Sequence, residues 1–352
     1  MDFTKCTKTE LIAICKEKQI SGYSSKKKDE LVQMLIGEVK HDSVDSISID
    51  TRSKPVIKWV GGKTQILSTV LEMFPVEINN YYEPFLGGGS VLIGLLMKQR
   101  EGSIEIHGAI YASDLNLALV SVYKNIQSRP HDTIGELNHI ISQYVEAKQG
   151  TIVNRSARTL KEALTSEESY YYYIRQKYNS LSLEEKKTPV ASAMFIFMNK
   201  TCFRGVYREG PNGFNVPFGN YANPKIMDET HILFISELVK DVVFIHRPYG
   251  EALSNLVPGD FVYLDPPYAP ENDKSFVSYN ACGFNLEDHT DLFKQCSHMS
   301  EKNVKFVLSN SDVQMVKSAF DSPLYKTKIV SCRRSIHSSD PSAKTNEVLI
   351  SN

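Results

Sequence analysis

The sequence has little that would build a metal centre or a disulfide framework. Its 352 residues include six cysteines and nine histidines, and neither set shows the paired spacing of a zinc site or a disulfide scaffold. The cysteines stand at positions 6, 15, 202, 282, 296 and 332. Scattered cysteines of this kind are typical of a reducing compartment, so we expect an intracellular protein without a metal.

Long apolar runs and excess charge are also missing. No run approaches the roughly 18 apolar residues that a membrane helix needs, and no signal peptide is recognisable, so we expect no membrane contact. The formal net charge of -1 argues against a protein that coats a polyanion. Any nucleic-acid contact must then come from local basic patches. With 41% hydrophobic and 23% charged residues, the chain suits two or three domains with a sizeable core.

The most informative motif that is present is Asp265-Pro266-Pro267-Tyr268, directly after the apolar run 261–264. The run predicts a buried strand, which places the motif at its carboxyl edge. The prolines restrict the backbone and fix the direction of the Pro266 carbonyl. The Asp265 carboxylate and this carbonyl could accept the two hydrogens of an amino group on a nucleobase, while Tyr268 stacks on the base. An ordinary turn is the alternative, and the motif alone favours neither.

A second pattern, typical of nucleotide binding, lies upstream. Residues 81–97 predict a strand, a glycine turn with Gly87 and Gly89, and a helix. The dinucleotide pattern G-x-G-x-x-G is incomplete because Leu92 stands at its sixth position. A further predicted strand ends at Asp114, whose carboxylate could bind the ribose hydroxyls of a nucleoside cofactor. Nicotinamide cofactors and S-adenosylmethionine both carry this ribose, but only the second donates a methyl group to an amine.

A third block, residues 54–64, ends in Gly61-Gly62-Lys63-Thr64, and this ending resembles a phosphate-binding loop. The phosphate-loop pattern requires glycine at position 57, where this chain has Ile57, so the nucleotide hydrolase interpretation fails. Trp59, the single tryptophan, could instead form a wall of a cofactor pocket, with a plain core tryptophan as the alternative.

The combination of motifs resembles the Dam-type DNA adenine-N6 methyltransferases, in the order cofactor, target recognition, catalytic. The resemblance covers roughly residues 54 to 352 and implies an α/β fold: a Rossmann-like S-adenosylmethionine-dependent methyltransferase sheet with an inserted, mainly helical target-recognition domain. Four blocks carry it: Lys58 to Lys63, Glu83 to Ser90, Asn199 to Gly219, and Asp265 to Tyr268.

This resemblance also implies roles for individual residues. The catalytic residues that would hold a flipped adenine are Asp265, Pro266, Pro267 and Tyr268. The residues that would bind S-adenosylmethionine are Trp59, Lys63, Phe85, Gly87, Gly89, Asp114 and Asp265. The methyl group would pass directly in line from cofactor to amine, a reaction that requires neither a metal nor a covalent intermediate.

The segment 199–219 alternates basic, aromatic and glycine residues, which favours a hairpin loop that contacts DNA. Lys200 could bind phosphate, which positions the protein without specifying a sequence. The resemblance implies that Arg208 reads a base and that Arg204 lies where the flipped base has left the stack. Asn215 belongs to the same candidate set. Arg204 stands where the best-known Dam members have asparagine, so a GATC target is not assumed.

The amino terminus predicts a small helical hairpin. A capping box from Thr7 to Glu10 opens one helix, and the basic cluster Lys26, Lys27 and Lys28 opens a second. The hairpin resembles the SAP DNA-binding motif, in which these lysines would contact phosphates. A hairpin that only stabilises the main domain is the alternative.

These patterns predict a division of the chain: a SAP-like motif at 1–37, a linker at 38–54, a catalytic domain at 55–120 and 250–352, and a target-recognition domain at 121–249. Within the last, the tyrosine-rich tract 170–179 favours a core helix with a solvated rim over a surface that stacks on bases.

The predicted function is site-specific methylation of adenine N6 in double-stranded DNA, as part of a restriction-modification system if a cognate restriction endonuclease acts on the same site. Three alternatives stay open at this point. Cytosine-N4 methylation uses the same chemistry, and an RNA or a protein glutamine amide could replace DNA as substrate. The third alternative is a DNA-binding scaffold with an inert catalytic domain.

Overall fold

The computed structural model describes residues 6–17, 27–28, 31–32, 54–270, 284–333 and 344–352. The chain divides into two compact units, Met1–Arg52 and Ser53–Asn352. No helix in the described ranges combines the length and the apolarity that a membrane crossing requires.

The smaller unit contains helix α1 (Lys8–Glu17). The predicted capping box is confirmed, because the Thr7 amide donates to Glu10 Oε2 at 2.7 Å and the Glu10 amide donates to Thr7 Oγ1 at 3.3 Å. Most of the second predicted helix, including Lys26, lies outside the described residues. Three apolar side chains of this unit are buried together: Leu11, Leu31 and Val32.

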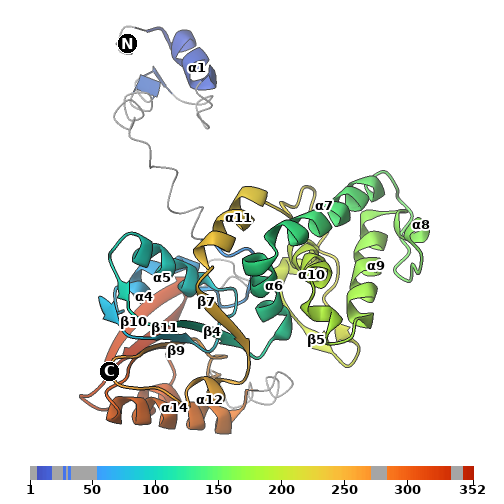
Figure 1. The fold of residues 1–352 in the computed structure, drawn as a ribbon. Coiled ribbons are helices and arrows are strands. Elements are labelled where there is room, and N and C mark those ends of the chain that lie inside the picture. The colour runs from blue at the N-terminus through green and yellow to red at the C-terminus, as the bar shows by residue number, and fades with distance from the viewer. Residues whose placement is uncertain (1–5, 18–26, 29–30, 33–53, 271–283, 334–343) are drawn as a thin grey trace. The chain divides into compact units, whose positions relative to one another are not determined.

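The larger unit is built around a mixed sheet that, within the described residues, has seven strands in the order β10-β11-β9-β8-β2-β4-β7 (Figure 1). The five strands from β9 to β7 run parallel, whereas β11 is antiparallel to both of its neighbours. The strand bounds are β2 (Tyr81–Glu83), β4 (Ile110–Asp114), β7 (Val242–His246), β8 (Phe261–Leu264), β9 (Lys305–Ser311), β10 (Lys326–Arg333) and β11 (Lys344–Ser351).

Strand β8 is apolar throughout because both of its faces are covered. Phe261 and Tyr263 point into one hydrophobic core, and Val262 and Leu264 point into a second core on the opposite face. All four side chains are buried, as expected for a central parallel strand between two layers of helices. The predicted buried strand is therefore confirmed, and its last residue directly precedes Asp265.

Helices cover both faces of the sheet (Figure 1). One face packs against α4 (Leu67–Leu71) and α5 (Ser90–Arg100), and the other against α14 (Leu286–Glu301). The remaining elements near the sheet are η2 (Lys63–Gln65), β1 (Glu77–Ile78), β3 (Glu105–Ile106), α6 (Leu117–Ser128), α11 (Glu229–Leu238), α12 (Tyr249–Ala252) and α15 (Gln314–Ala319). This arrangement is a mixed α/β fold with a mostly parallel central sheet, as the sequence predicts.

Between α6 and α11 the chain forms a mainly helical region beside the sheet (Figure 1). Its elements are α7 (Pro130–Ala147), α8 (Leu160–Ala163), α9 (Glu167–Ser180), η3 (Glu185–Lys187), α10 (Pro189–Thr201), η4 (Phe203–Gly205), β5 (Glu209–Gly210) and β6 (Gly213–Phe214). The tyrosines Tyr170 and Tyr171 on α9 are fully buried, which confirms the predicted core helix. That residues 121–249 act as a target-recognition domain stays a prediction.

Candidate active site

The candidate site lies where the strand order of the sheet reverses. From β2 the chain moves outward to β4 and β7, then returns to the other side of β2 and continues through β8 and β9. In open parallel sheets this reversal leaves a crevice at the carboxyl ends of the two central strands. The glycine turn follows β2 and Asp265 follows β8, while Asp114 ends β4. The topology therefore brings the predicted cofactor and catalytic motifs to one edge.

An ion pair between Lys63 and Asp265 joins two of these motifs. Lys63 Nζ lies 2.7 Å from Asp265 Oδ2, although 202 residues separate them in the chain. The ammonium also donates to the Gly61 carbonyl at 2.6 Å and lies 5.0 Å from the centre of the Tyr268 ring. Only 3% of the Lys63 side chain is exposed, against 20% of Asp265. A carboxylate is thus held at the carboxyl edge of β8 by a buried cation.

Burial raises the pKa of Asp265 above its usual value, because removing a carboxylate from water penalises its charged form. The Lys63 ammonium opposes this rise, and the negative charge of Glu347 adds to it. Burial in a low-dielectric site also strengthens every hydrogen bond that the charged carboxylate accepts.

The turn at 265–269 is braced from β9, the strand beside β8, and from β11, the next strand beyond β9. The Tyr268 hydroxyl donates to Glu347 Oε2 at 2.7 Å, which fixes the ring beside Lys63. The amide of Ala269 donates to Asn310 Oδ1 at 3.0 Å, and Asn310 is completely buried at the end of β9. Pro266 is buried beneath this turn, whereas Pro267 is exposed. Asn310 ends a run, 305–310, that predicts a buried strand with polar groups near the substrate cleft, whereas no motif singles out Glu347.

The glycine turn after β2 fits tightly against the protein's own aromatic rings. Gly87 and Gly89 have φ angles of +50° and +76°, a region that favours glycine. A Cβ on Gly87 would lie 3.0 Å from Trp59 Cδ1, and one on Gly89 would lie 2.5 Å from Tyr123 Oη. The Tyr123 hydroxyl donates to the Gly88 carbonyl at 2.6 Å. The glycines therefore serve internal packing, a requirement that the sequence analysis did not foresee.

Asp114 ties the glycine turn to the next loop. One of its carboxylate oxygens accepts the Gly87 amide at 2.9 Å, and the other accepts the Asn116 amide at 2.8 Å. Burial raises the pKa of Asp114, and these two backbone amides oppose the rise. Phe85, at the start of the turn, is half-buried and packs at 5.3 Å from the ring of Tyr249.

Two of the predicted DNA-contacting residues flank the short β5–β6 hairpin, and the other two precede it in the chain, on η4 and at the end of α10. Arg208 Nε donates to Asn215 Oδ1 at 2.6 Å across the hairpin, so these two predicted residues are brought together. Arg204 has a positive φ of 56°, and its amide donates to the Tyr221 hydroxyl at 2.8 Å. Lys200 is half-buried at the end of α10. Burial lowers the pKa of Lys200 to about 8, and the charges of Lys58 and Lys225 contribute.

The predicted lysines of the amino-terminal motif belong to the separate smaller unit. Lys27 and Lys28 are exposed there, and Lys26 falls outside the described residues. The DNA-binding role of all three stays a prediction.

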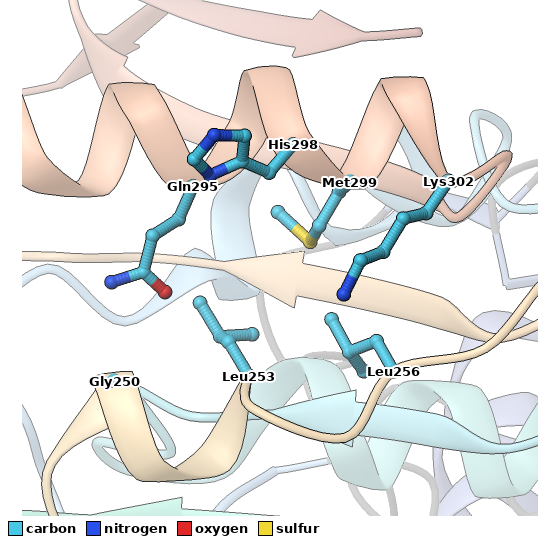
Figure 2. A pocket seen from close by; sticks show the side chains of 7 residues that line it. All are labelled: Gly250, Leu253, Leu256, Gln295, His298, Met299 and Lys302. Atoms are coloured by element: carbon cyan, nitrogen blue, oxygen red, sulfur yellow. The ribbon is translucent and has the colours of Figure 1, made fainter.

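The described part of the chain also contains a hollow that lies away from this edge. It has a volume of about 260 Å³ and lies between α12 with the loop that follows it and the carboxyl end of α14 (Figure 2). Its lining residues are Gly250, Leu253, Leu256, Gln295, His298, Met299 and Lys302. Within the described ranges, no group of three or more histidine, cysteine or acidic side chains could hold a metal ion.

A comparison with family models identifies the chain. The model described as D12 class N6 adenine-specific DNA methyltransferase matches residues 59–336. The chain belongs to this family. It is therefore an enzyme that methylates the N6 amino group of adenine in DNA, and the adenine specificity of the family decides against the cytosine-N4 alternative.

Individual relatives agree with the family assignment. The Type II methyltransferase M.MjaIII of Methanocaldococcus jannaschii is 37% identical over 266 residues, which are 73% of this chain and 84% of that protein. The Type II methyltransferase M1.LlaDCHI of Lactococcus lactis subsp. cremoris is 30% identical over 310 residues, 85% of this chain and 95% of that protein. The DNA adenine methylase of Escherichia coli K12 is 26% identical, with the same two coverages of 85% and 95%.

This methyltransferase has one further acid near Asp265 and Asp114, Glu83, to which the sequence motifs assign no role. Glu83 ends β2 with 2% exposure and accepts a hydrogen bond from the Tyr81 hydroxyl at 2.7 Å. Burial raises the pKa of Glu83 to about 8; the Tyr81 hydroxyl opposes the rise, and the charges of Asp265 and Asp114 add to it. The sequence shows a glutamate at the end of a predicted strand, but it does not show that this side chain is buried.

This acid predicts a pH dependence of stability. Between the usual pKa of 4.5 and the folded value of about 8, the folded protein keeps a proton on Glu83 that the unfolded chain releases. Stability then falls as pH rises through this window, and Glu83→Gln removes that loss. We expect the melting temperature of the wild type to fall more between these pH values than that of Glu83→Gln. Exposed Glu301→Gln is the control; equal slopes for all three proteins would contradict the prediction.

Proposed function

We propose that this enzyme transfers a methyl group from S-adenosylmethionine to the N6 amino group of an adenine extruded from double-stranded DNA. The observation that carries the proposal is the Asp265 carboxylate, buried and braced at the carboxyl end of β8 beside the glycine turn. The turn, Asp114 and Trp59 surround the same edge. The substrate is then a base that must leave the helix to reach this edge, as in other enzymes that act on nucleobases.

The residues at this edge fit S-adenosylmethionine. Each Asp114 oxygen accepts one backbone amide and has further lone pairs, which suit the two ribose hydroxyls. Phe85 and Trp59 offer half-buried aromatic surface on either side of the glycine turn. When bound, the cofactor supplies an electrophilic methyl group on a sulfonium. The full set that we propose for binding it is Trp59, Lys63, Phe85, Gly87, Gly89, Asp114 and Asp265.

The catalytic turn acts on the nucleophile. The lone pair of an adenine amino group is delocalised into the ring, so the nitrogen attacks poorly unless acceptors draw electron density back to it. Asp265 Oδ2 accepts from Lys63, and we assign Asp265 Oδ1 and the Pro266 carbonyl to the two amino hydrogens. These bonds strengthen as the nitrogen becomes tetrahedral and positive, so they favour the transition state over the ground state. Tyr268 would stack on the base, and a proton leaves the nitrogen after the methyl group has been transferred.

The direct test is methyl transfer to unmethylated genomic DNA, with nucleoside mass spectrometry of the product. We expect N6-methyladenine from the wild type, and a loss of about 100-fold or more from Asp265→Ala, because one transition-state acceptor is removed. Exposed Asp321→Ala is the matched control and should retain full transfer. Product in RNA alone would contradict the substrate, and cofactor binding without any transfer would favour the inert scaffold. Retained activity in Asp265→Ala would remove the catalytic assignment.

We further propose that Lys200, Arg204, Arg208 and Asn215 contact DNA around the β5–β6 hairpin, as part of a target-recognition domain at 121–249. Burial lowers the pKa of Lys200, and the positive charges of Lys58 and Lys225 lower it further. The three lysines therefore share one region of positive charge, which supports phosphate binding. The Arg208–Asn215 pair is pre-organised, which suits a side chain that reads a base.

Phosphate binding by Lys200 predicts that DNA affinity depends on pH. The free enzyme loses the Lys200 charge as pH rises through about 8, whereas a bound phosphate holds the proton. Affinity should therefore fall above this pH, by up to about tenfold per pH unit for one proton. Lys200→Arg stays charged and should flatten the profile, and Lys225→Arg is the control that keeps it. Fluorescence anisotropy at fixed ionic strength measures the profiles; a steep profile in Lys200→Arg would contradict the role.

For the smaller unit we propose a SAP-like motif whose lysines bind phosphates without reading sequence. The confirmed capping box and the buried trio Leu11, Leu31 and Val32 support a folded helical unit that presents Lys27 and Lys28 outward. We also propose that residues 38–54 form a linker and that residues 55–120 and 250–352 form the catalytic domain, as the sequence predicts. The names of the two Type II relatives further support a restriction-modification setting, with a cognate restriction endonuclease that acts on the same site inside the cell.

Replacing Lys26, Lys27 and Lys28 together by alanine tests the motif in the full-length chain. We expect weaker binding to duplexes of any sequence, with a salt dependence whose slope falls by about one unit for each lysine that no longer binds a phosphate. Methyl transfer at saturating DNA should be unchanged, because the catalytic edge lies in the other unit. Exposed Lys8→Ala is the control. An unchanged affinity and salt slope would return the unit to a purely structural role.

A further inference from the structure

One buried amide connects the loop that carries Lys58 and Trp59 with the segment that carries Arg204. Asn199, near the end of α10, is 3% exposed. Its Oδ1 accepts the Lys58 amide at 2.8 Å, and its Nδ2 donates to the Lys58 carbonyl at 2.8 Å. This two-way pairing imitates one rung of a β-ladder across 141 residues of chain. The orientation of the side-chain amide is fixed by these partners. A flipped amide would place its NH2 group against the Lys58 amide and its oxygen against the Lys58 carbonyl, so that donor would face donor and acceptor would face acceptor.

The same amide also holds the segment that carries Arg204. Asn199 Nδ2 donates to the Gly205 carbonyl at 3.3 Å, and Gly205 has a φ of +64°. A Cβ on Gly205 would lie 2.6 Å from Lys58 Cδ, so the Lys58 side chain packs directly on this glycine. Lys58 Nζ then lies 5.3 Å from the centre of the Tyr221 ring, whose hydroxyl accepts the Arg204 amide. These contacts join the Arg204 segment to the backbone and side chain of Lys58.

The next residue carries this connection to the cofactor edge. Trp59 packs against the glycine turn, since a Cβ on Gly88 would lie 2.9 Å from Trp59 Cβ. On its other side Trp59 meets Tyr207, with ring centres 5.3 Å apart. Tyr207 lies between η4 and the β5–β6 hairpin. The Lys58-Trp59 dipeptide is thus held between the segment proposed to contact DNA and the turn proposed to bind the cofactor.

We propose that Asn199 is a positioning residue that couples DNA binding to cofactor binding, through the backbone of Lys58 and the ring of Trp59. The inference rests on the proposed function and adds to it a route between its two binding sites. DNA bound at the hairpin orders the Arg204 segment, the three hydrogen bonds of Asn199 fix Lys58, and Trp59 is fixed against the glycine turn. Because coupling is reciprocal, the cofactor must strengthen DNA binding by the same factor.

The chain provides a matched control for this role. Asn179 on α9 makes the same two-way amide pairing, with the Phe214 amide and carbonyl, both at 2.9 Å. It braces the β5–β6 hairpin, and its pairing reaches β6 rather than the loop that carries Lys58 and Trp59. Asn179→Ala therefore removes a matched pair of amide hydrogen bonds from the hairpin and leaves the hydrogen bonds of Asn199 to Lys58 and Gly205 in place.

The experiment measures a coupling factor with the full-length enzyme. The dissociation constant of sinefungin, an unreactive analogue of S-adenosylmethionine, is determined with and without a duplex that the wild type methylates. The constant for the duplex is determined with and without sinefungin, so that the two ratios check one another. We expect a wild-type factor in the usual range of about 5 to 150, and a factor within about twofold of one for Asn199→Ala. Asn179→Ala should weaken DNA binding and keep the wild-type factor.

A second variant keeps the test informative if Asn199→Ala does not fold. Tyr207→Leu removes the ring that meets Trp59 from the hairpin side, and it should also reduce the factor. A wild-type factor of one, an unchanged factor in a folded Asn199 or Tyr207 variant, or an equal loss in Asn179→Ala would overturn the inference. Failure of the wild type to methylate DNA would instead overturn the proposed function, so the two failures are distinguishable.

Discussion

The carboxylate of Asp265, held by the buried ammonium of Lys63 at 2.7 Å, is the constraint on which the site depends. Leaving either charge buried without the other would be strongly unfavourable, so the pair fixes the loop before α4 against the end of β8. That contact holds the Asp265 carboxylate at the carboxyl edge of the sheet, where it can act as an acceptor. The acceptor is strong because water is largely excluded from it, and it is directed because prolines follow it.

Around this pair the site is assembled from side chains that brace one loop against another. Glu347 holds the Tyr268 ring, Asp114 holds the glycine turn, and Asn199 holds the backbone of Lys58. Asn199 is buried, and Glu347 and Asp114 are half-buried. Each of the three stands on a helix or a strand and holds a loop through a hydrogen bond. A site of this kind can present preorganised acceptors to a substrate that arrives from outside the protein.

Much of the fold could be predicted from local patterns. The apolar run before Asp265, the strand that ends at Asp114 and the capping box at Thr7 are local in sequence, and the structure confirms them. The braces could not be predicted, because Lys63 and Asp265 are 202 residues apart and Asn199 and Lys58 are 141 apart. The composition also does not reveal that Trp59 and Tyr123 pack so closely on the glycine turn that a Cβ there would clash with them. It does not reveal that Glu83 is buried with a pKa of about 8. Such facts depend on which loops the sheet order brings together.

The most direct measurement of the central claim is a crystal structure of the enzyme with sinefungin and a duplex that it methylates. The account predicts an adenine extruded from the duplex, with its amino nitrogen within hydrogen-bond distance, about 3 Å, of both an Asp265 oxygen and the Pro266 carbonyl. The Tyr268 ring should lie against the face of that base. A structure in which the Asp265 carboxylate points away from the extruded base, or in which sinefungin binds away from the glycine turn, would contradict it.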